Sequence, residues 1–441
     1  MNKKTENKAV SPWQWVPSLY FAQGIPYVVV MSVALILFKR MGMSNTDIAL
    51  YTSGLNLPWV IKPLWSPLVD LLKTKRWWIV VMQILVGAGL AGIALTIQGP
   101  LAFRYCLAFM WLLAFSSATH DIAADGFYML GLNEKKQAYF VGIRNTFYRF
   151  AVIFGQGILV MFAGWLEQRY AREMPETAAI PQAWSLTFYL LTILFALLFV
   201  YHYLFLPHPR RDTCTLPPQQ ASAGRVFKEF LGTFTSFFQK KHIVSALIFI
   251  LLYRFAEAQL VKITSPFLLD TPATGGLALS TAEVGFIYGT IGVIALTIGG
   301  IVGGIAMARR GLKSCLWTMT IAMNLPNIVY LYLSFARPES IGIISGCVAI
   351  EQFGYGFGFT SLTYFMMLFS NGKHQTAHYA ICTGFMALGL MLPGMISGWI
   401  EESIGYRAFF VWIMLCTIPS FWATHLVRKN LTDNHSDNSS R

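Results

Sequence analysis

Apolar runs long enough to cross a lipid bilayer recur along the whole chain and leave little room for a soluble fold. A helix needs about 20 mostly apolar residues to span a bilayer. Runs of this kind lie at 15–37, 46–69, 77–97, 103–125, 138–163, 184–206, 243–268, 282–307, 315–335, 340–369, 376–400 and 407–427. The pattern predicts an all-α membrane protein with twelve transmembrane helices in two groups of six.

Composition agrees with this prediction and excludes a large soluble domain. The chain is 55% hydrophobic and only 12% charged, whereas soluble domains carry roughly 25% charged residues. Mean hydropathy is +0.54. The six cysteines show no CxxC or His-paired spacing, so we expect neither a metal nor a cofactor. No soluble catalytic core can be placed, and we expect no enzyme activity.

The net charge of +13 is explained by topology rather than by nucleic-acid binding. Most of the 33 Lys and Arg residues fall in the N-terminus, in alternate loops and in the tail. That asymmetry is typical of loops on the cytoplasmic side. We therefore expect both termini to be cytoplasmic and no nucleic-acid partner.

The longest connection divides the chain into two halves. We predict six-helix halves at 1–206 and 243–427, a cytoplasmic linker at 207–242, and a disordered cytoplasmic tail at 428–441. The linker ends in an amphipathic segment, Val226–Phe238, which predicts a helix lying on the inner membrane surface.

The fourth apolar run carries titratable residues that lipid does not tolerate. Asp121 and Asp125 are four residues apart and share one helix face, and His120 lies beside them. Burial and a like charge one turn away both favour protonated carboxyl groups. This indicates a proton-carrying pair. The alternative is that Asp125 forms a static ion pair with Arg144.

Further polar residues in the apolar runs are candidates for proton coupling or substrate binding. Glu257 and Glu351 are additional candidate proton carriers. Lys62 and Arg149 have no sequence-local partner, so we expect them to bind a substrate carboxylate or phosphate. Arg254 lies three residues before Glu257, and these two also fit a structural ion pair. The other expected substrate contacts are Tyr27, Trp59 and Gln352.

The layout and two short loops resemble the major facilitator superfamily. Ser66 to Asp70, followed by Arg76, is similar to that superfamily's acidic and basic turn after helix 2, and Gly304 to Lys313 is similar to its second copy. Such loops act as gates in transporters. The resemblance implies gating roles for Asp70, Arg76, Arg144 and Arg309, although a plain basic loop also fits.

Glycines four residues apart recur in the second half, at Gly299/Gly303, Gly300/Gly304, Gly354/Gly358 and Gly394/Gly398. Small residues at this spacing let helices approach closely in lipid. We expect close helix contacts at these positions.

Several separated stretches together match one family of transporters: Lys62 to Asp70, Phe115 to Asp125, Tyr253 to Glu257, Glu351, and Pro393 to Trp399. They resemble the AmpG-type muropeptide permeases, which are similar to acetyl-coenzyme A transporters. His120 stands where that family usually has Gln. The resemblance implies a proton-coupled symporter of the bacterial inner membrane that imports peptidoglycan-derived muropeptides or related amino sugars, such as N-acetylmuramic acid, for cell-wall recycling. We expect a monomer in contact with lipid.

Two other interpretations remain open. An exporter or importer of another small acidic metabolite, a drug or a siderophore would have the same fold. An exporter is less favoured because the run Gly155 to Gly164 has no proline. An intramembrane enzyme would need a clustered His/Asp set, for which His120 and Asp121 are the only indication.

Overall fold

The computed structural model describes residues 11–209, 212, 232, 234–371 and 375–438. Side chains are not described at 67–68, 70–71, 134–135, 138, 141, 375–376 and 431–438.

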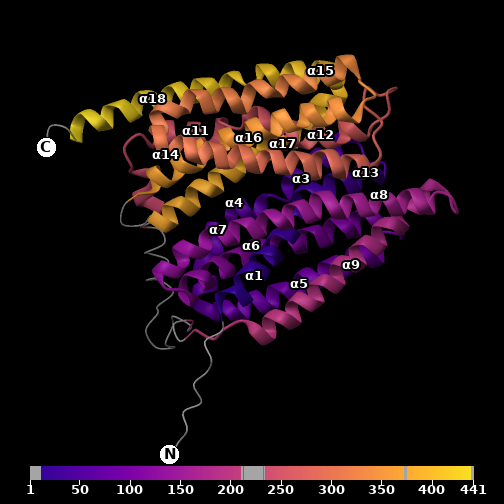
Figure 1. The fold of residues 1–441 in the computed structure, drawn as a ribbon, viewed down its shortest axis with the longest axis horizontal. Coiled ribbons are helices and arrows are strands. Elements are labelled where there is room, and N and C mark those ends of the chain that lie inside the picture. Colours follow the sequence, from indigo (N-terminus) through magenta and orange to yellow (C-terminus); the bar gives the residue numbers. More distant parts are fainter. Residues whose placement is uncertain (1–10, 210–211, 213–231, 233, 372–374, 439–441) are drawn as a thin grey trace, which may run out of the picture. The chain divides into compact units, whose positions relative to one another are not determined.

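Helices make up nearly all of the described chain, and none of its residues lies in a β-strand. Figure 1 shows them as α1 (Val16–Val28), α2 (Ala34–Arg40), α3 (Asn45–Gly54), α4 (Leu57–Leu72), α5 (Lys75–Thr96), α6 (Ala102–Gly131), α7 (Glu134–Val152), α8 (Leu159–Tyr170) and α9 (Glu176–Phe205). The later helices are α11 (Ile243–Leu252), α12 (Phe255–Leu269), α13 (Thr281–Val284), α14 (Val293–Asn324), α15 (Ile328–Ala336), α16 (Ile341–Ser370), α17 (Gln375–Leu415) and α18 (Ile418–Asn438). Wider π-helical turns form η2 (Val29–Val33), η3 (Ile153–Ile158) and η4 (Gly285–Gly292), and 3-10 turns form η1 (Pro12–Gln14) and η5 (Leu325–Asn327).

The all-α membrane fold expected from the sequence is confirmed. Eight helical stretches of the described chain are long and apolar enough to cross a membrane. Two of them contain 56 and 54 residues, far more than the roughly 20 needed for one crossing. Gly311 (φ 73°) and Gly405 (φ 76°) interrupt these two stretches with left-handed backbone, which glycine adopts readily. The count of twelve helices remains a prediction.

Side-chain caps explain where several helices begin. The first amide groups of a helix lack partners within it, and Ser, Thr or Asn just before the helix supplies an acceptor. Here Ser44, Thr74, Asn133 and Ser280 accept from the backbone amides three residues later. Polar residues between the apolar runs therefore set the helix starts.

The chain forms two compact units, described separately here. The first contains the described residues of Met1–Val28, Leu64–Phe154 and Trp184–Gln220. Its core brings together α1, α5 and α6, including Trp15, Leu19, Ile79 and Phe127. The rings of Trp15 and Phe127 meet edge to face with their centroids 5.2 Å apart, a favourable aromatic geometry.

The second unit contains the described residues of Val29–Pro63, Gly155–Ala183 and Ala221–Arg441. Within it α14 and α16 lie side by side (Figure 1). A Cβ atom added to Gly299 would lie 2.1 Å from the Phe353 carbonyl oxygen, and one on Gly303 would lie 2.8 Å from that of Phe357. These glycines therefore permit the close contact expected from their spacing. Gly304 has no such neighbour within 4 Å.

Only the end of the amphipathic linker segment Val226–Phe238 can be assessed, because most of it lies outside the described residues. Phe237 is fully buried. Its ring packs against those of Phe369, Phe385 and His378. At least this part of the segment contacts protein.

Candidate functional site

Asp125 on α6 lies in a three-residue network of the first unit. Tyr20 on α1 donates from its hydroxyl to Asp125 over 3.0 Å, and Arg144 on α7 forms an ion pair with the same carboxylate at 3.2 Å. Arg144 also donates to the Tyr20 hydroxyl at 2.9 Å. The network joins three helices through one carboxylate oxygen. It matches the ion pair considered as an alternative role for Asp125.

The Arg144 side chain is held by aromatic rings as well as by charge. Its guanidinium carbon lies 5.0 Å from the ring centroids of both Tyr20 and Tyr128, within the range of cation–π attraction. Arg144 Nε has no hydrogen-bonding partner in the described structure. The cation is therefore fixed in place, with one donor still available.

Asp121 lies one turn earlier on α6 and has a different neighbour. Gln23 on α1 donates from its side-chain amide to Asp121 Oδ1. Gln23 is buried, and its Oε1 atom has no hydrogen-bonding partner among the described residues. The two carboxylates thus lie in distinct settings, one against an amide and one in an ion pair.

His120 belongs to a second network, in which His120, Gln83 and His202 are buried and Ser18 is half-buried. It lies 3.1 Å from the Gln83 side-chain nitrogen, and Gln83 in turn contacts His202 Nδ1 at 2.9 Å. His202 Nε2 contacts the Ser18 hydroxyl at 2.9 Å. Successive helical residues point about 100° apart, which explains why His120 and Asp121 contact different helices. Sequence spacing gave no sign of His202 or Gln83 as partners.

Two of the buried carboxyl groups in the second unit are those of Glu351 and Glu257. Glu351 on α16 accepts from the Tyr330 hydroxyl at 3.1 Å and from the Gln352 amide at 2.9 Å. Glu257 on α12 is 3% exposed, and its Oε2 atom has no hydrogen-bonding partner in the described part of the chain. An ionised carboxylate in that position is costly unless paired. These groups are suited to carrying a proton.

Arg254 lies at a break between α11 and α12 rather than within one helix. It donates to the Tyr355 hydroxyl, and its guanidinium lies 5.1 Å from the Tyr355 ring and 5.0 Å from that of Phe359. No ion pair joins it to Glu257 among the described residues. The break explains this, because the three-residue spacing pairs side chains only along a continuous helix.

The other expected substrate contacts fall in both units. In the second unit, Lys62 and Trp59 are half-buried on α4, and Gln352 is buried beside Glu351. In the first unit, Arg149 is half-buried on α7, and Tyr27 lies 6.3 Å from the Tyr148 ring. The role of each remains a prediction.

The expected gating residues have varied surroundings. The side chain of Asp70 lies outside the described residues. Arg76 donates from Nε to the Leu206 carbonyl at 3.3 Å and from Nη2 to that of Tyr203, so it caps the end of α9. Arg309 is exposed on α14, near the interruption at Gly311.

Sequence reasoning missed a polar cluster within the second unit, which we call the Lys39 cluster: Lys39, Asn45, Asp270, Glu401 and Tyr406. Lys39 pairs with Asp270 at 2.6 Å and donates to Asn45 at 2.8 Å. Asn45 donates to Glu401 at 2.7 Å and to the Tyr406 hydroxyl at 2.8 Å. Tyr406 donates to Asp270 at 2.5 Å. The cluster connects α2 and α3 to residues that follow α12 and lie in the middle of α17.

A second ion-pair group lies nearby in sequence. Arg40 pairs with Glu167 at 3.1 Å and with Glu176 at 2.8 Å, and Thr281 donates to Glu167 at 2.7 Å. The contact of Thr281 with Glu167 connects a residue after position 243 with one before position 206. Lys39 and Arg40 at the end of the first apolar run were the available signal, but the carboxylates with which they pair lie more than a hundred residues away.

Glycine contacts bring the backbones together in the same unit. A Cβ atom on Gly289 in η4 would lie 2.0 Å from the Gln156 carbonyl oxygen in η3. A Cβ atom on Gly398 in α17 would lie 1.9 Å from the Asn45 carbonyl oxygen in α3. No side chain fits at either point.

Lys262 on α12 is a further buried cation. It is 2% exposed, and its ammonium donates to the Thr52 hydroxyl at 3.3 Å. The neighbouring Ser53 hydroxyl is buried without a hydrogen-bonding partner in the described structure. A charged amine with one neutral partner is expensive to bury.

Comparison with known proteins agrees with this architecture. "Putative transporter AmpG 4" of Rickettsia felis is 25% identical over 427 residues, covering 94% of this chain and 95% of the relative. "Anhydromuropeptide permease" of Escherichia coli K12 is 24% identical over 420 residues, covering 94% and 79%. The solved structure of a D-xylose-proton symporter shares the fold with a TM-score of 0.69 at 13% identity, covering 94% of this chain and 96% of that one. The resemblance to AmpG-type permeases is thus confirmed. The sequence pattern of the Major Facilitator Superfamily matches residues 18–376, and the chain belongs to this superfamily.

Proposed function

We propose that this protein is a permease that imports anhydromuropeptides or related amino sugars across a bacterial inner membrane for cell-wall recycling. The similarity to an anhydromuropeptide permease along 94% of the chain is the observation that carries the proposal. On this proposal the protein is a transporter and not an enzyme. It works as a monomer in lipid, with both termini cytoplasmic.

Protons drive the import in this proposal. The proton carriers are Asp121 and Asp125 in the first unit and Glu257 and Glu351 in the second. His120, next to Asp121 in the sequence, belongs to the same proton-coupling set. Glu257 supports this assignment because its Oε2 atom has no hydrogen-bonding partner in the described structure. Coupling requires only that protonation and substrate binding favour the same conformation.

The substrate is an acidic sugar, so it needs cations and flat apolar surfaces. Lys62, Arg149 and Arg254 bind its lactyl or peptide carboxylates, since charge-assisted hydrogen bonds are the strong ones. Tyr27 and Trp59 lie against the sugar rings, and Gln352 donates to their hydroxyl groups.

Gating takes place by making and breaking polar contacts at helix ends. The Lys39 cluster holds one end of the second unit closed, since Lys39, Asp270 and Tyr406 bond one another there. Asp70, Arg76 and Arg309 act at loops and helix ends elsewhere, and Arg144 acts from within α7. Opening replaces the contacts of the Lys39 cluster with water.

Uptake by energised vesicles tests the proposal. Radiolabelled anhydromuropeptide and free N-acetylmuramic acid are supplied separately, with and without a protonophore. Accumulation of either that the protonophore abolishes is the expected result, and it selects the substrate. Failure of folded protein to accumulate either would favour export or another acidic metabolite. Recovery of chemically altered muropeptide would indicate an enzyme.

A further inference from the structure

A cavity of 360 Å³ lies in the second unit, away from all the residues assigned above. Its lining consists of Lys240, Lys241, His242, Ser245, Ala246, Phe365, Leu368, Phe369, Asn371, Val427 and Asn430. Pockets that bind small molecules have volumes of about 300–1,000 Å³. The cavity is large enough for a phosphate-bearing headgroup.

Two helix ends meet at this cavity, which places it at the level of the lipid headgroups. Lys240 to His242 directly precede α11, and Asn371 follows α16. Phe238 and Val244 beside it are 46% and 68% exposed. Exposed apolar side chains at the end of a membrane helix face lipid tails.

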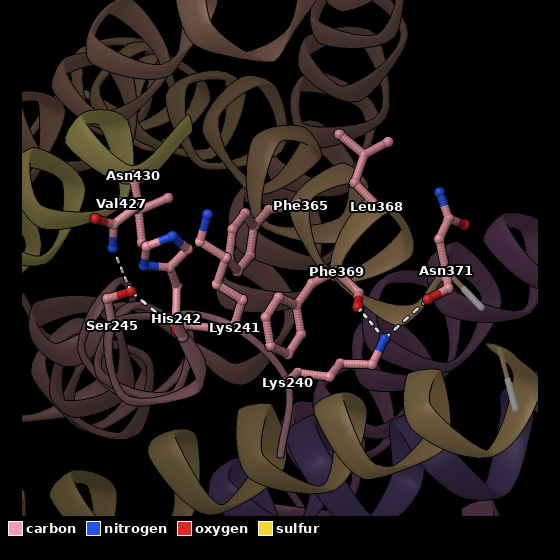
Figure 2. A pocket seen from close by; sticks show the side chains of 11 residues that line it. Lys240, Lys241, His242, Ser245, Phe365, Leu368, Phe369, Asn371, Val427 and Asn430 are labelled. Carbon is pink, nitrogen blue, oxygen red and sulfur yellow. Dashed lines mark hydrogen bonds between the residues drawn. The ribbon is translucent and has the colours of Figure 1, made fainter. Parts of the chain in front are cut away.

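The polar part of the cavity contains hydrogen-bonding groups that have no partner in the described structure. Figure 2 shows Lys240 donating to the carbonyl oxygens of Phe369 and Asn371, at 2.6 Å and 2.9 Å. An ammonium group has three donors, so one remains. His242 Nε2 is buried with no hydrogen-bonding partner in the described structure. Partial burial lowers the pKa of Lys240, an effect that a bound anion would oppose.

The opposite part of the cavity is apolar. Phe365, Leu368 and Phe369 lie along one side of α16, and Val427 faces them from α18 (Figure 2). Free phosphate would gain nothing from this wall. A ligand with an anionic head and a hydrocarbon chain would use both parts of the cavity.

We propose that this cavity binds the phosphate headgroup of an anionic phospholipid. Lys241, His242 and Asn430 contact the phosphate, and the start of an acyl chain lies along Phe365 and Leu368. Basic pockets at the ends of membrane helices recognise anionic headgroups in this way. The site lies apart from the transport residues, and the inference does not depend on the substrate.

Lipid retention by the purified full-length protein tests this inference. Native mass spectrometry compares phosphatidylglycerol with phosphatidylethanolamine on the wild-type protein. The matched variants are Lys241→Glu, at an exposed position in the cavity, and Arg310→Glu, at an exposed position on α14. We expect the wild-type protein to prefer phosphatidylglycerol about tenfold. Lys241→Glu should lose this preference, and Arg310→Glu should keep it.

Equal preference in the Lys241→Glu and wild-type proteins would overturn the inference. So would displacement of bound phosphatidylglycerol by inorganic phosphate at the same concentration, which would indicate a site for the free anion. Hydrogen exchange on the wild-type protein in nanodiscs gives a second test that needs no variant. Phosphatidylglycerol should slow exchange at the start of α11, and unchanged exchange there would also overturn the proposal.

Discussion

At the scale of single residues, the two acids of α6 are distinguished by their neighbours. Asp125 shares an ion pair with Arg144 and accepts from Tyr20, whereas Asp121 accepts from the Gln23 amide. Protonation of Asp125 would weaken its ion pair with Arg144 and so a contact between α6 and α7. On the proposed mechanism both acids carry protons.

The first prediction concerns these two acids. Asp121→Asn and Asp125→Asn should each lower proton-driven accumulation at least tenfold, because amides cannot carry the proton. Substrate exchange without a proton gradient should continue, since the binding cations are intact. Uptake and counterflow in the same vesicles measure both. Glu339→Gln, at an exposed position, is the control, and unimpaired accumulation in Asp121→Asn would disprove the assignment.

The second prediction concerns Lys262. Lys262→Met removes a buried cation held by one neutral hydroxyl group. The midpoint of thermal unfolding should therefore not fall, and the free energy of unfolding should rise by about 1 kcal/mol. Substrate uptake should fall at least tenfold if the cation is kept for function. Thermal unfolding followed by tryptophan fluorescence measures the first effect. A clear loss of stability would mean that Lys262 is a structural residue.

At the scale of helices, close backbone contacts determine which elements pack together. Gly398 leaves no room for a side chain against Asn45 of α3, whereas Gly346 on α16 has open space around its Cβ position. Gly398→Ala should therefore destabilise the packing of α3 on α17 by about 1–3 kcal/mol. Gly346→Ala should leave stability nearly unchanged. Thermal unfolding of both variants checks this, and equal midpoints would contradict it.

Sequence periodicity predicted the apolar runs well but not their interruptions. The run at 46–69 is divided into α3 and α4, and the run at 243–268 is divided at Tyr253 and Arg254. Hydropathy averages over about 20 residues and does not detect a one-turn break. The second break decides the neighbours of Arg254, so the ion pair with Glu257 that the spacing also allowed is absent from the described structure.

At the scale of the whole molecule, the Lys39 cluster joins segments far apart in the sequence. Lys39 and Asp270 are 14% and 18% exposed, so the pair is only partly screened by solvent. The composition of the apolar runs predicted the fold class. It carried no information about this cluster, because ion pairs between distant segments depend on tertiary packing. The candidate acids were found in advance because a charge in an apolar run is conspicuous by itself.

Breaking the Lys39 cluster should favour opening of the end of the second unit at which Lys39 and Asp270 lie. Lys39→Ala should increase the open population about 5- to 30-fold, the effect of losing roughly 1–2 kcal/mol. The reaction of a water-soluble maleimide with Ser53→Cys reports opening, because Ser53 is buried. The exchanged pair Lys39→Asp with Asp270→Lys should restore slow labelling. Fast labelling in the exchanged pair would mean that the charge pair is not what closes this end.

The most direct test of the central claim is proton movement driven by substrate in sealed liposomes. A pH-sensitive dye inside the liposomes is followed after anhydromuropeptide is added outside. Proton-coupled import predicts acidification of the interior by the wild-type protein and none by the double variant Asp121→Asn with Asp125→Asn. Entry of labelled substrate through the wild-type protein without any acidification would contradict the account.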